Sequence, residues 1–526
     1  MVDDGLTLLE VLRERLSLHS LKDGCSPQGQ CGCCTVWVDG VPRVACVTPV
    51  RRLDGREITT LEGLPQRDSQ AWAGALVASG GSQCGFCTPG IVMRLAALEG
   101  PVTDDRIDQS LLAHLCRCTG WQTIREAAHG VLDSAPVLDP EAGPTRDLVD
   151  AATRAALEGG VPQQVGPAVV LGQAGFADDG CPADALVAVV DATADGYAVA
   201  ESLSAARAAA GKVQGRSTTV PLAHPVGVPP GGWALTLSTT WVEPAYVEPD
   251  ASWCQPGAEP ASPYGNGGAF GGKLHSPVAM DARRLADEHG RPVRVLWSRE
   301  DVVRLGPKRP PVAGGIAPDG AGVLRVGVTG GAVDGHAWAE LARSVATVAP
   351  GLVLEQVVVV GPPVSFDLRA AVWAEAAVLA AAVRLASGDG PVVDVPVEVT
   401  APAGGRAVVR CADDGSLDIE VAAGSVLDAV VLRSYVIGAA HQALGWVGSE
   451  GIAVGFDGQV QDLTVRSFGI LQSRAMPQVT VRLVDGPVTS PVNGSDAVFA
   501  AVAAARWLAD GVPPTWPTDR SGAGRR

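Results

Sequence analysis

Two sets of cysteines near the N-terminus have spacings that suit metal ligation. Nine of the twelve cysteines precede residue 119, and such clustering indicates metal binding more than disulfide formation in a reducing compartment. The first set is Cys-x5-Cys-x2-Cys with a fourth cysteine further on, and the second is Cys-x2-Cys followed by Cys-x-Cys. The candidate ligands are Cys25, Cys31, Cys34 and Cys46 in the first set, and Cys84, Cys87, Cys116 and Cys118 in the second.

The first set favours a [2Fe–2S] cluster. Four thiolates hold such a cluster, and glycines in the ligand loop let backbone N–H groups turn toward the sulfur atoms. Gly24, Gly29 and Gly32 supply that freedom here. Cys33 also lies in the motif, but we expect its side chain to turn away from the cluster. Zinc is the alternative, because four thiolates suit Zn²⁺ as well.

The second set argues more strongly for iron and sulfur. A Cys-x-Cys pair is unusual for structural zinc, whose ligand pairs generally have two or more residues between them. Cys84 and Cys87 precede one expected helix, and Cys116 and Cys118 precede another. Four thiolates therefore meet at helix N-termini, where the helix dipoles favour negative charge.

A glycine-rich run lies in the second half of the chain, over residues 267–273. Glycines let backbone N–H groups approach oxo and phosphate oxygens closely, so the run is a candidate cofactor loop. A plain tight loop is the alternative, and the spacing does not fit a dinucleotide-binding Gly-x-Gly-x-x-Gly. The candidate cofactor-binding residues are Gly267, Gly268, Phe270, Gly271 and Gly272.

The elements expected around these residues are mixed. Residues 5–64 contain an apolar helical stripe and a hairpin that turns at Asp39-Gly40. Residues 69–133 form four short helices, and residues 134–148 are a linker rich in proline and acidic residues. Beyond the linker, strands at 293–297 and 479–484 alternate with helices at 278–289, 370–387 and 496–509. These patterns predict an α+β multidomain protein.

Composition excludes several function classes. A chain of 526 residues with 47% hydrophobic residues builds two or more cores. The formal net charge of −17 argues against a nucleic-acid partner. Neither a signal peptide nor an apolar run long enough to span a membrane is evident. We therefore expect a soluble, cytoplasmic protein.

Four sequence runs carry a resemblance to a known family. Residues 24–36 (GCSPQGQCGCCTV), 59–63 (TTLEG), 83–90 (QCGFCTPG) and 115–120 (LCRCTG) resemble the iron–sulfur subunit of the molybdenum hydroxylases, which include xanthine dehydrogenase, aldehyde oxidase and carbon monoxide dehydrogenase. A weaker resemblance to the same family continues at residues 172–179, 243–249, 267–273, 298–301 and 306–310. The resemblance implies an iron–sulfur subunit fused to a shortened, divergent molybdopterin-binding subunit.

The resemblance also implies a domain order. A plant-ferredoxin-like β-grasp domain is followed by a four-helix [2Fe–2S] bundle and shortened α+β domains. The expected boundaries are a ferredoxin-like domain at 1–66, a helical domain at 67–135, a linker at 136–149, a hammerhead-like α+β region at 150–262, a molybdopterin-binding-like region at 263–515 and a flexible tail at 516–526.

Cofactors and partners follow from the same resemblance. It implies two [2Fe–2S] clusters and molybdenum–molybdopterin, with Gln83 contacting the pterin, Cys118 close to it and the 267–273 loop against the metal centre. No FAD-binding stretch is recognisable, so FAD would sit on a partner chain. The expected partners are an FAD-binding subunit, a larger molybdenum subunit and a small-molecule substrate.

The resemblance is incomplete where catalysis is concerned. Family molybdenum subunits are longer, and between Trp253 and Gly265 this chain has a short linker where they have a cofactor-contacting segment. The family's catalytic base is a glutamate near the C-terminus. Asp496 takes the corresponding place as candidate base, one methylene shorter. It suits equally the N-cap of a helix over 497–508, because Asp is favoured at helix starts.

Three functions remain open. The leading one is a molybdenum-dependent oxidoreductase of the xanthine dehydrogenase family that hydroxylates an aldehyde or N-heterocycle and passes electrons through two [2Fe–2S] clusters. The second is an iron–sulfur electron-transfer subunit whose molybdopterin-type region is catalytically inactive. The third, a zinc-stapled interaction protein, is disfavoured by the Cys-x-Cys pair.

Overall fold

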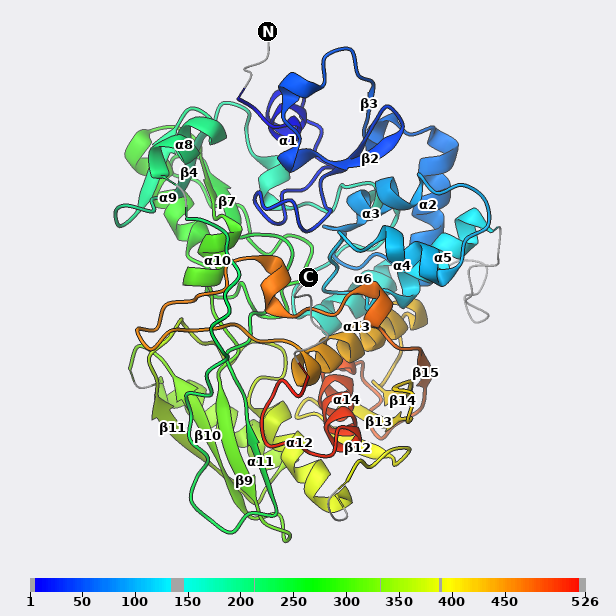
Figure 1. Cartoon of the computed structure of the whole chain (residues 1–526), viewed down its shortest axis with the longest axis vertical. Helices are drawn as coiled ribbons and strands as arrows, with labels where there is room; N and C mark the ends of the chain where they lie inside the picture. The colour runs from blue at the N-terminus through cyan, green and yellow to red at the C-terminus, as the bar shows by residue number, and fades with distance from the viewer. Residues whose placement is uncertain (1–4, 134–145, 212, 332, 387–389, 520–526) are drawn as a thin grey trace.

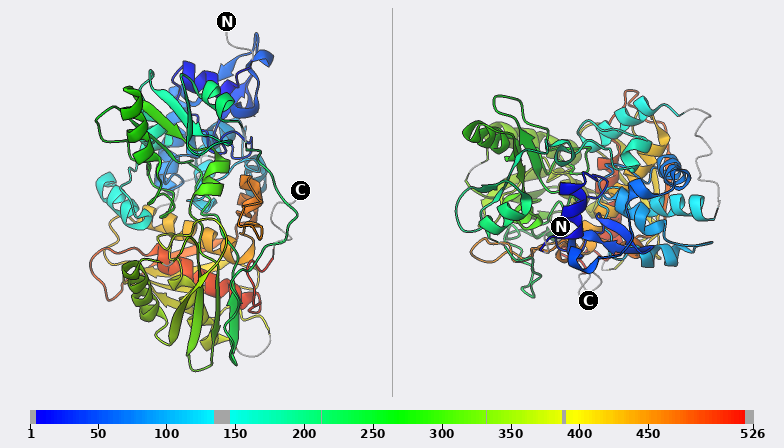
Figure 2. Two further views of the ribbon diagram at one scale, coloured as in Figure 1. Left: turned by 90° about the vertical axis from the view of Figure 1, so that its left-hand side faces the viewer. Right: turned by 90° about the horizontal axis from the view of Figure 1, so that it is seen from above.

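The computed structural model describes residues 5–133, 146–211, 213–331, 333–386 and 390–519. Figure 1 shows an upper part, with the N-terminal iron–sulfur candidate region beside one sheet, and a lower part with two further sheets. The side view of Figure 2 shows the same separation. The four sheets have the strand orders β2-β1-β3, β5-β4-β8-β7, β11-β10-β9-β6 and β12-β13-β14-β15.

The first sheet belongs to the N-terminal region and is small. The turn expected at Asp39-Gly40 is confirmed, and both residues have a positive φ, of 50° and 73°. The helical stripe before it is also confirmed, as a short helix that continues into a π-helix. The elements are α1 (Leu8–Glu10), η1 (Val11–Arg15), β1 (Thr35–Val38), β2 (Val41–Val44), η2 (Ala45–Val47), η3 (Val50–Arg52), β3 (Ile58–Thr59) and η4 (Leu61–Gly63).

Four helices follow, as the sequence predicts. Thr103 accepts a hydrogen bond from the Arg106 backbone N–H and so caps the third helix, while a proline occupies the first turn of the second. The helices are α2 (Gln66–Ser79), α3 (Thr88–Leu95), α4 (Asp104–Ser110) and α5 (Gln122–Leu132).

Most of the expected linker lies outside the described residues. Its last residues are ordered, because Arg146 pairs with Asp428 and α6 begins at Leu148. The sheet that follows uses β8, so it runs across the boundary expected between residues 262 and 263. The elements here are α6 (Leu148–Gly159), α7 (Pro167–Val170), η5 (Ala177–Gly180), β4 (Leu186–Val190), β5 (Tyr197–Ala200), α8 (Leu203–Ala210), β7 (Ala251–Cys254), α9 (Val278–His289), β8 (Val293–Leu296) and α10 (Arg299–Leu305).

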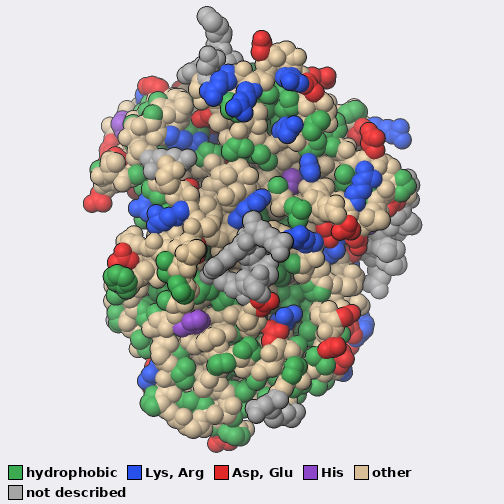
Figure 3. Space-filling model, viewed as in Figure 1, with side chains coloured by type: hydrophobic (Ala, Val, Ile, Leu, Met, Phe, Trp, Pro, Cys, Tyr) green, Lys and Arg blue, Asp and Glu red, His purple; other side chains and the backbone are tan. Residues whose placement is uncertain are grey.

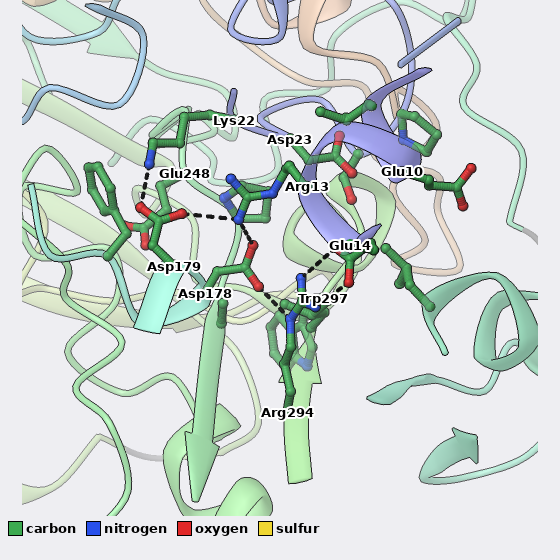
Figure 4. Close-up of a pocket in the computed structure, with 18 of the residues that line it drawn as sticks. Glu10, Arg13, Glu14, Lys22, Asp23, Asp178, Asp179, Glu248, Arg294 and Trp297 are labelled. Carbon is green, nitrogen blue, oxygen red and sulfur yellow. Dashed lines mark hydrogen bonds and ion pairs between the residues drawn. The ribbon is translucent and has the colours of Figure 1, made fainter. Parts of the chain in front are cut away.

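An ion-pair network joins this sheet to the N-terminal region, as Figure 4 shows. Arg294 on β8 contacts Asp178 at 2.6 Å and Glu14 at 2.7 Å. Arg13 contacts Asp178 at 2.7 Å and Asp179 at 3.0 Å. Arg13 and Arg294 are both largely buried. These ion pairs therefore help to hold the N-terminal region on the second sheet, in addition to apolar packing.

The lower part contains the two remaining sheets and the longest helices. Helices α13 and α14 are buried along nearly their whole length and pack against each other. The expected helices and strands here are confirmed. The elements are β6 (Leu235–Ser238), β9 (Val312–Ile316), β10 (Gly322–Val328), α11 (Gly335–Val348), β11 (Leu352–Val358), α12 (Trp373–Leu385), β12 (Val397–Thr400), β13 (Arg406–Cys411), β14 (Leu417–Ala422), α13 (Ala429–Gly448), η6 (Val465–Phe468), η7 (Ser473–Ala475), β15 (Val479–Leu483) and α14 (Ser495–Ala509).

The C-terminal segment is folded further than the sequence predicts. Trp516, placed by the sequence at the start of a flexible tail, is buried, and its backbone N–H donates to the Ser238 carbonyl at 2.9 Å. Residue 516 therefore belongs to the folded part. In the described part of the chain, no helix combines the length and the apolarity that crossing a membrane requires.

Candidate metal and cofactor site

The first four candidate ligands come together in a buried loop. Contacts join the thiol of Cys25 to those of Cys31 and Cys46, and the thiol of Cys46 to that of Cys34. Backbone N–H groups of Gln28 and Gln30 lie 3.3 and 3.4 Å from the Cys25 Sγ. Short stretches of loop and the η2 turn thus direct four sulfur atoms and several N–H donors inward, as an iron–sulfur cluster requires.

Cys33, which the sequence analysis leaves out of the ligand set, is buried beside Cys31. Its thiol contacts that of Cys31, and its Sγ lies 3.7 Å from the Cys31 carbonyl oxygen. The side chain is 1% exposed. Gly32, between the two cysteines, has a φ of +72°, and a Cβ there would meet the ring of His114 at 2.4 Å.

The second four candidate ligands also converge. The Sγ atoms of Cys84 and Cys118 are 3.6 Å apart, and the thiols of Cys87 and Cys116 are in contact. Cys87 is the N-cap residue of α3. Thr119 supports the set, since its Oγ1 lies 3.2 Å from the Cys116 Sγ. Among the described residues, no three His, Cys, Asp or Glu side chains form a site for a single metal ion.

The two cysteine sets lie against each other. The Leu115 backbone N–H donates to the Cys31 carbonyl at 3.0 Å, directly before Cys116. A Cβ on Gly90 would lie 2.3 Å from the Gly32 carbonyl oxygen, so only glycine fits there. A backbone hydrogen bond thus connects the surroundings of one cysteine set to those of the other.

The glycine-rich loop covers the second cysteine set directly. A Cβ built on Gly268, whose φ is +86°, would lie 2.9 Å from the Cys84 Sγ and 3.2 Å from the Cys118 Sγ. Asn266 donates to the Cys84 carbonyl at 3.3 Å. Because the loop has glycines at the point of contact, its backbone lies directly beside the two thiols and occupies the space next to them.

Gln83 and Phe270 extend this arrangement into the lower part. Gln83 Nε2 donates to the Cys118 carbonyl at 3.0 Å and to Ser434 Oγ at 2.9 Å. The ring of Phe270 meets that of Tyr435 edge-on at 6.3 Å. Gln83 therefore lies beside the second cysteine set, whereas Phe270 packs on Tyr435 of α13.

Asp496 is close to the same region but is engaged by a guanidinium. Arg369 Nε donates to Asp496 Oδ1 at 2.9 Å, and the Arg369 guanidinium lies 4.5 Å from the centre of the Phe270 ring. Gln442 accepts a further hydrogen bond from Arg369 at 3.1 Å. The Asp496 carboxylate is therefore held in an ion pair with Arg369, whose side chain is almost fully buried.

The alternative role for Asp496, as a helix N-cap, is wrong. Helix α14 begins at Ser495, so Asp496 lies in its first turn. Its backbone N–H donates to Asn493 Oδ1 at 2.9 Å. The buried carboxylate of Glu158 accepts from the N–H groups of Gly494 and Ser495, at distances of 2.9 to 3.2 Å. Capping is therefore shared between a neighbouring residue and one distant in sequence.

The space between the loop and the second cysteine set is too small for a pterin. The cavity lined by Cys84, Cys118 and Gly268 measures about 10 Å³, which is the room of one water molecule. Pockets that hold a small molecule measure about 300–1,000 Å³. The residues that the family resemblance assigns to molybdopterin are present, but in this arrangement they do not fit it.

A buried ion pair closes the cavity on its other side. Lys273 Nζ donates to Glu248 Oε2 at 2.6 Å, and both side chains are almost fully buried. Burial raises the pKa of Glu248 to about 7, although the Lys273 charge opposes this shift. The pair holds the end of the glycine-rich loop on the chain segment that follows Tyr246.

Comparison with known proteins shows to which family this chain belongs. The profile of a [2Fe–2S] binding domain family matches residues 60–129. A probable xanthine dehydrogenase subunit of Bacillus subtilis is 40% identical over 124 residues, covering 23% of this chain and 71% of the relative. The xanthine dehydrogenase iron–sulfur-binding subunit of Escherichia coli O157:H7 is 43% identical over 126 residues, covering 23% of this chain and 78% of that subunit. The chain belongs to the molybdenum hydroxylase family.

The molybdenum hydroxylase fold extends beyond the part with high sequence identity. The aldehyde oxidoreductase from Desulfovibrio gigas matches with a TM-score of 0.64 at 15% identity, over 99% of this chain and 98% of that one. At this identity the likeness concerns the fold alone. The chain is therefore an α+β oxidoreductase-family member with a [2Fe–2S] binding domain near its N-terminus.

Several residues of the site carry no signal in the sequence. Glu158 and Arg369 belong to no local motif, and their partners lie more than a hundred residues away. Leu115 is an ordinary apolar residue whose backbone, not its side chain, makes the contact. Its sequence position, directly before the candidate ligand Cys116, was the only indication that it lies near the site.

Proposed function

We propose that this chain is an iron–sulfur electron-transfer oxidoreductase of the molybdenum hydroxylase family. Two [2Fe–2S] clusters, one on each set of four cysteines, pass single electrons between partners. The molybdopterin-type region supports the second cluster and does not hold a pterin. The contact of Gly268 with Cys84 and Cys118 carries this proposal, because it leaves a cavity of about 10 Å³.

The cluster environments support a directional path. The first set is surrounded by backbone N–H donors from its own loop, and the second lies at helix starts beside buried charges. Hydrogen bonds and burial tune cluster potentials, so two different environments favour two different potentials. The Leu115–Cys31 hydrogen bond provides a short connection between them.

Hydroxylation of an aldehyde or N-heterocycle at a molybdenum centre is the second candidate. The convergence of Gln83, Phe270 and Asp496 on one region supports it. It requires the loop at residues 266–270 to leave the cysteine pair and Asp496 to leave Arg369. An FAD-binding or larger molybdenum subunit remains a proposed partner under either function.

Metal analysis of anaerobically purified protein tests the choice. We expect about four irons per chain and no molybdenum, even in cells that load molybdenum into a co-expressed aldehyde oxidoreductase. That enzyme controls for cofactor supply. One molybdenum per chain beside the iron would overturn the electron-transfer proposal.

The number of clusters has a separate test. Cys116→Ser should abolish one of two electron paramagnetic resonance signals, because this ligand belongs to the second set only. Cys34→Ser is the matched change in the first set and should abolish the other signal. Loss of both signals from either change in folded protein would contradict two independent clusters.

A further inference from the structure

Arg117 lies between two ligands of the second cysteine set, and its side chain reaches a buried carboxylate. It is the residue between Cys116 and Cys118. Its Nη1 and Nη2 donate to Glu450 Oε1 at 2.5 Å and to Glu450 Oε2 at 2.8 Å. Two parallel N–H donors on one carboxylate make a strong and directional pair. The two residues are 333 positions apart, so the fold alone brings them together.

The surrounding fold reserves the place of this pair. Glu450 follows the end of α13, and its backbone N–H donates to the Gly445 carbonyl at 2.7 Å. A Cβ on Gly445 would lie 2.2 Å from Glu450 Oε1, so a side chain there would displace the carboxylate. Arg117 Nε donates to the Pro244 carbonyl at 3.1 Å, and the Arg117 carbonyl accepts from Gln442 at 3.0 Å. The guanidinium is therefore held in one orientation.

Both charges of the pair are shielded from solvent. Figure 3 shows other Lys, Arg, Asp and Glu side chains spread over one face of the molecule, where water and salt screen their charges. Arg117 and Glu450 are 7% and 1% exposed. Arg117 also lines the small cavity that Cys84, Cys87 and Cys118 share. A change in the charge of this pair would therefore act on the second cysteine set with little screening.

The two cations that line this cavity, Arg117 and Lys273, are each paired with a carboxylate. Arg309, a further cation that acts on Glu450, has its own partner in Glu375, with two contacts of 2.9 Å. Burial raises the pKa of Glu450, and the charge of Arg117 opposes this shift. Glu450 is thus the group that neutralises Arg117 beside the cysteines.

We propose that Glu450 is a positioning residue that sets the reduction potential of the second cluster through Arg117. One-electron reduction makes a [2Fe–2S] cluster one charge more negative, and an uncompensated guanidinium beside its ligands would stabilise the reduced form. The Glu450 carboxylate orients the guanidinium and cancels its charge, so the potential stays low. This inference rests on the proposed function, because it requires a cluster on Cys84, Cys87, Cys116 and Cys118.

Redox titration of the iron-loaded full chain, followed by electron paramagnetic resonance, tests the inference. Glu450→Gln keeps the shape of the side chain and removes its negative charge. We expect the reduction equilibrium of the second cluster to move about tenfold or more toward the reduced form, which is about 59 mV for a one-electron couple. The first cluster should keep the equilibrium that it has in the parent protein. The signal of the second cluster is the one that Cys116→Ser abolishes.

Two further variants separate the effect of charge from that of packing. The double variant Arg117→Gln, Glu450→Gln removes both charges, so the equilibrium of the second cluster should return to within about threefold of the parent value. Asp428→Asn is the matched control, because it removes the carboxylate that pairs with Arg146 at the opposite end of α13, and Asn also caps helices well. This control should leave the equilibria of both clusters unchanged.

Three outcomes would overturn the inference. The first is a Glu450→Gln variant that keeps both signals and the parent equilibrium. The second is a shift toward the oxidised form, and the third is a shift that the double variant retains in full. If Glu450→Gln loses the second signal, Arg117→Gln replaces it in the titration. That variant leaves the carboxylate uncompensated and should shift the equilibrium toward the oxidised form, so an unchanged equilibrium would overturn the inference as well.

The result also separates this inference from the proposed function. Two cluster signals, no molybdenum and an equilibrium that the variants leave unchanged overturn the role of Glu450 alone. Molybdenum in the parent protein, or a parent protein without the second cluster, overturns the proposed function instead.

Discussion

Arg369 donates a 2.9 Å hydrogen bond to the carboxylate of Asp496, and its guanidinium stacks on Phe270 from the glycine-rich loop. One side chain thereby links the candidate base to the loop that covers the second cysteine set. The arrangement stabilises a closed site, because opening the loop would also expose the partner of Asp496. Substitutions in this closed site and in the contacts around it have distinct expected effects.

Replacement of Asp496 tests whether its carboxylate does chemistry. Asp496→Asn keeps the size of the side chain and removes its charge, so Arg369 loses an ionic partner. Because Asp496 is 29% exposed, we expect a small drop in thermal stability and unchanged electron transfer between reduced protein and an artificial acceptor. A general base contributes about 10²–10⁴-fold to rate; a loss of that size in aldehyde-dependent turnover would instead support the hydroxylase.

Gly268→Ala tests the contact between the loop and the cysteine pair. The added Cβ would meet two sulfur atoms, so we expect a shifted spectrum for the second cluster and an unchanged one for the first. Gly290→Ala is the matched control, since its φ of +61° carries similar backbone strain and nothing lies within 4 Å of the new Cβ. Equal spectra for both variants would show that Gly268 does not touch the cluster.

Arg294→Ala tests the ion-pair network between the two sheets of the upper part. It removes the partner of the part-exposed Glu14 and one of the two partners of Asp178, which keeps Arg13, so we expect a loss of about 1–3 kcal/mol. Arg291→Ala, three residues earlier, removes an exposed partner of Glu201 and should leave the thermal transition nearly unchanged. Similar transitions for the two variants would mean that the network contributes little.

Glu248 predicts a pH dependence of stability. Burial raises its pKa to about 7 in the folded protein, so the folded state holds this proton more tightly than the unfolded chain. This contribution to stability should be complete below about pH 4.5, the ordinary pKa of glutamate, and be lost as the pH rises to about 7. Glu248→Gln should flatten this slope, and Lys273→Met should steepen it, because the partner that favours the charged form is gone.

Thermal transitions at several pH values measure this slope. The variants are compared at each pH with the parent protein, since other groups also titrate over the range. A Glu248→Gln variant with the same slope as the parent would assign the pH dependence to other residues. A Lys273→Met variant with the parent's slope would show that the ion pair does not control it.

The elements and the cysteine sets were predictable because their signals are local. The turn at Asp39-Gly40 follows from two adjacent residues, and the helix over residues 278–289 from its apolar period. The position of Asp496 was not predictable in this way. Its partner Arg369 precedes α12 and the capping Glu158 lies in α6. The packing of α12 and α13 on α14, and of α6 on α13, brings these distant segments together. Local preference for Asp at a helix start therefore gave the wrong cap.

The cofactor loop shows a second limit. Its glycines indicated a close backbone approach, and the structure confirms one at Gly268. The pattern gave no information on what is approached, because a glycine fits a sulfur atom of the protein as well as an oxygen of a ligand. Which group packs against the glycine-rich loop is decided by the three-dimensional fold and not by the loop sequence.

The contact between Gly90 and Gly32 constrains how this protein can diverge. No side chain fits at residue 90, and Gly32 has a φ that other residues rarely adopt. A side chain at residue 90 would have to displace the loop of the first cysteine set, and a side chain at residue 32 would meet the ring of His114 beside the second set. The covering region meets the second set through similar close contacts, since a Cβ on Gly438 would lie 1.8 Å from the Cys118 carbonyl oxygen and one on Gly120 would lie 2.6 Å from the Ile437 carbonyl oxygen. Substitutions in the iron–sulfur region and in the region that covers it are therefore expected to accumulate together and not independently.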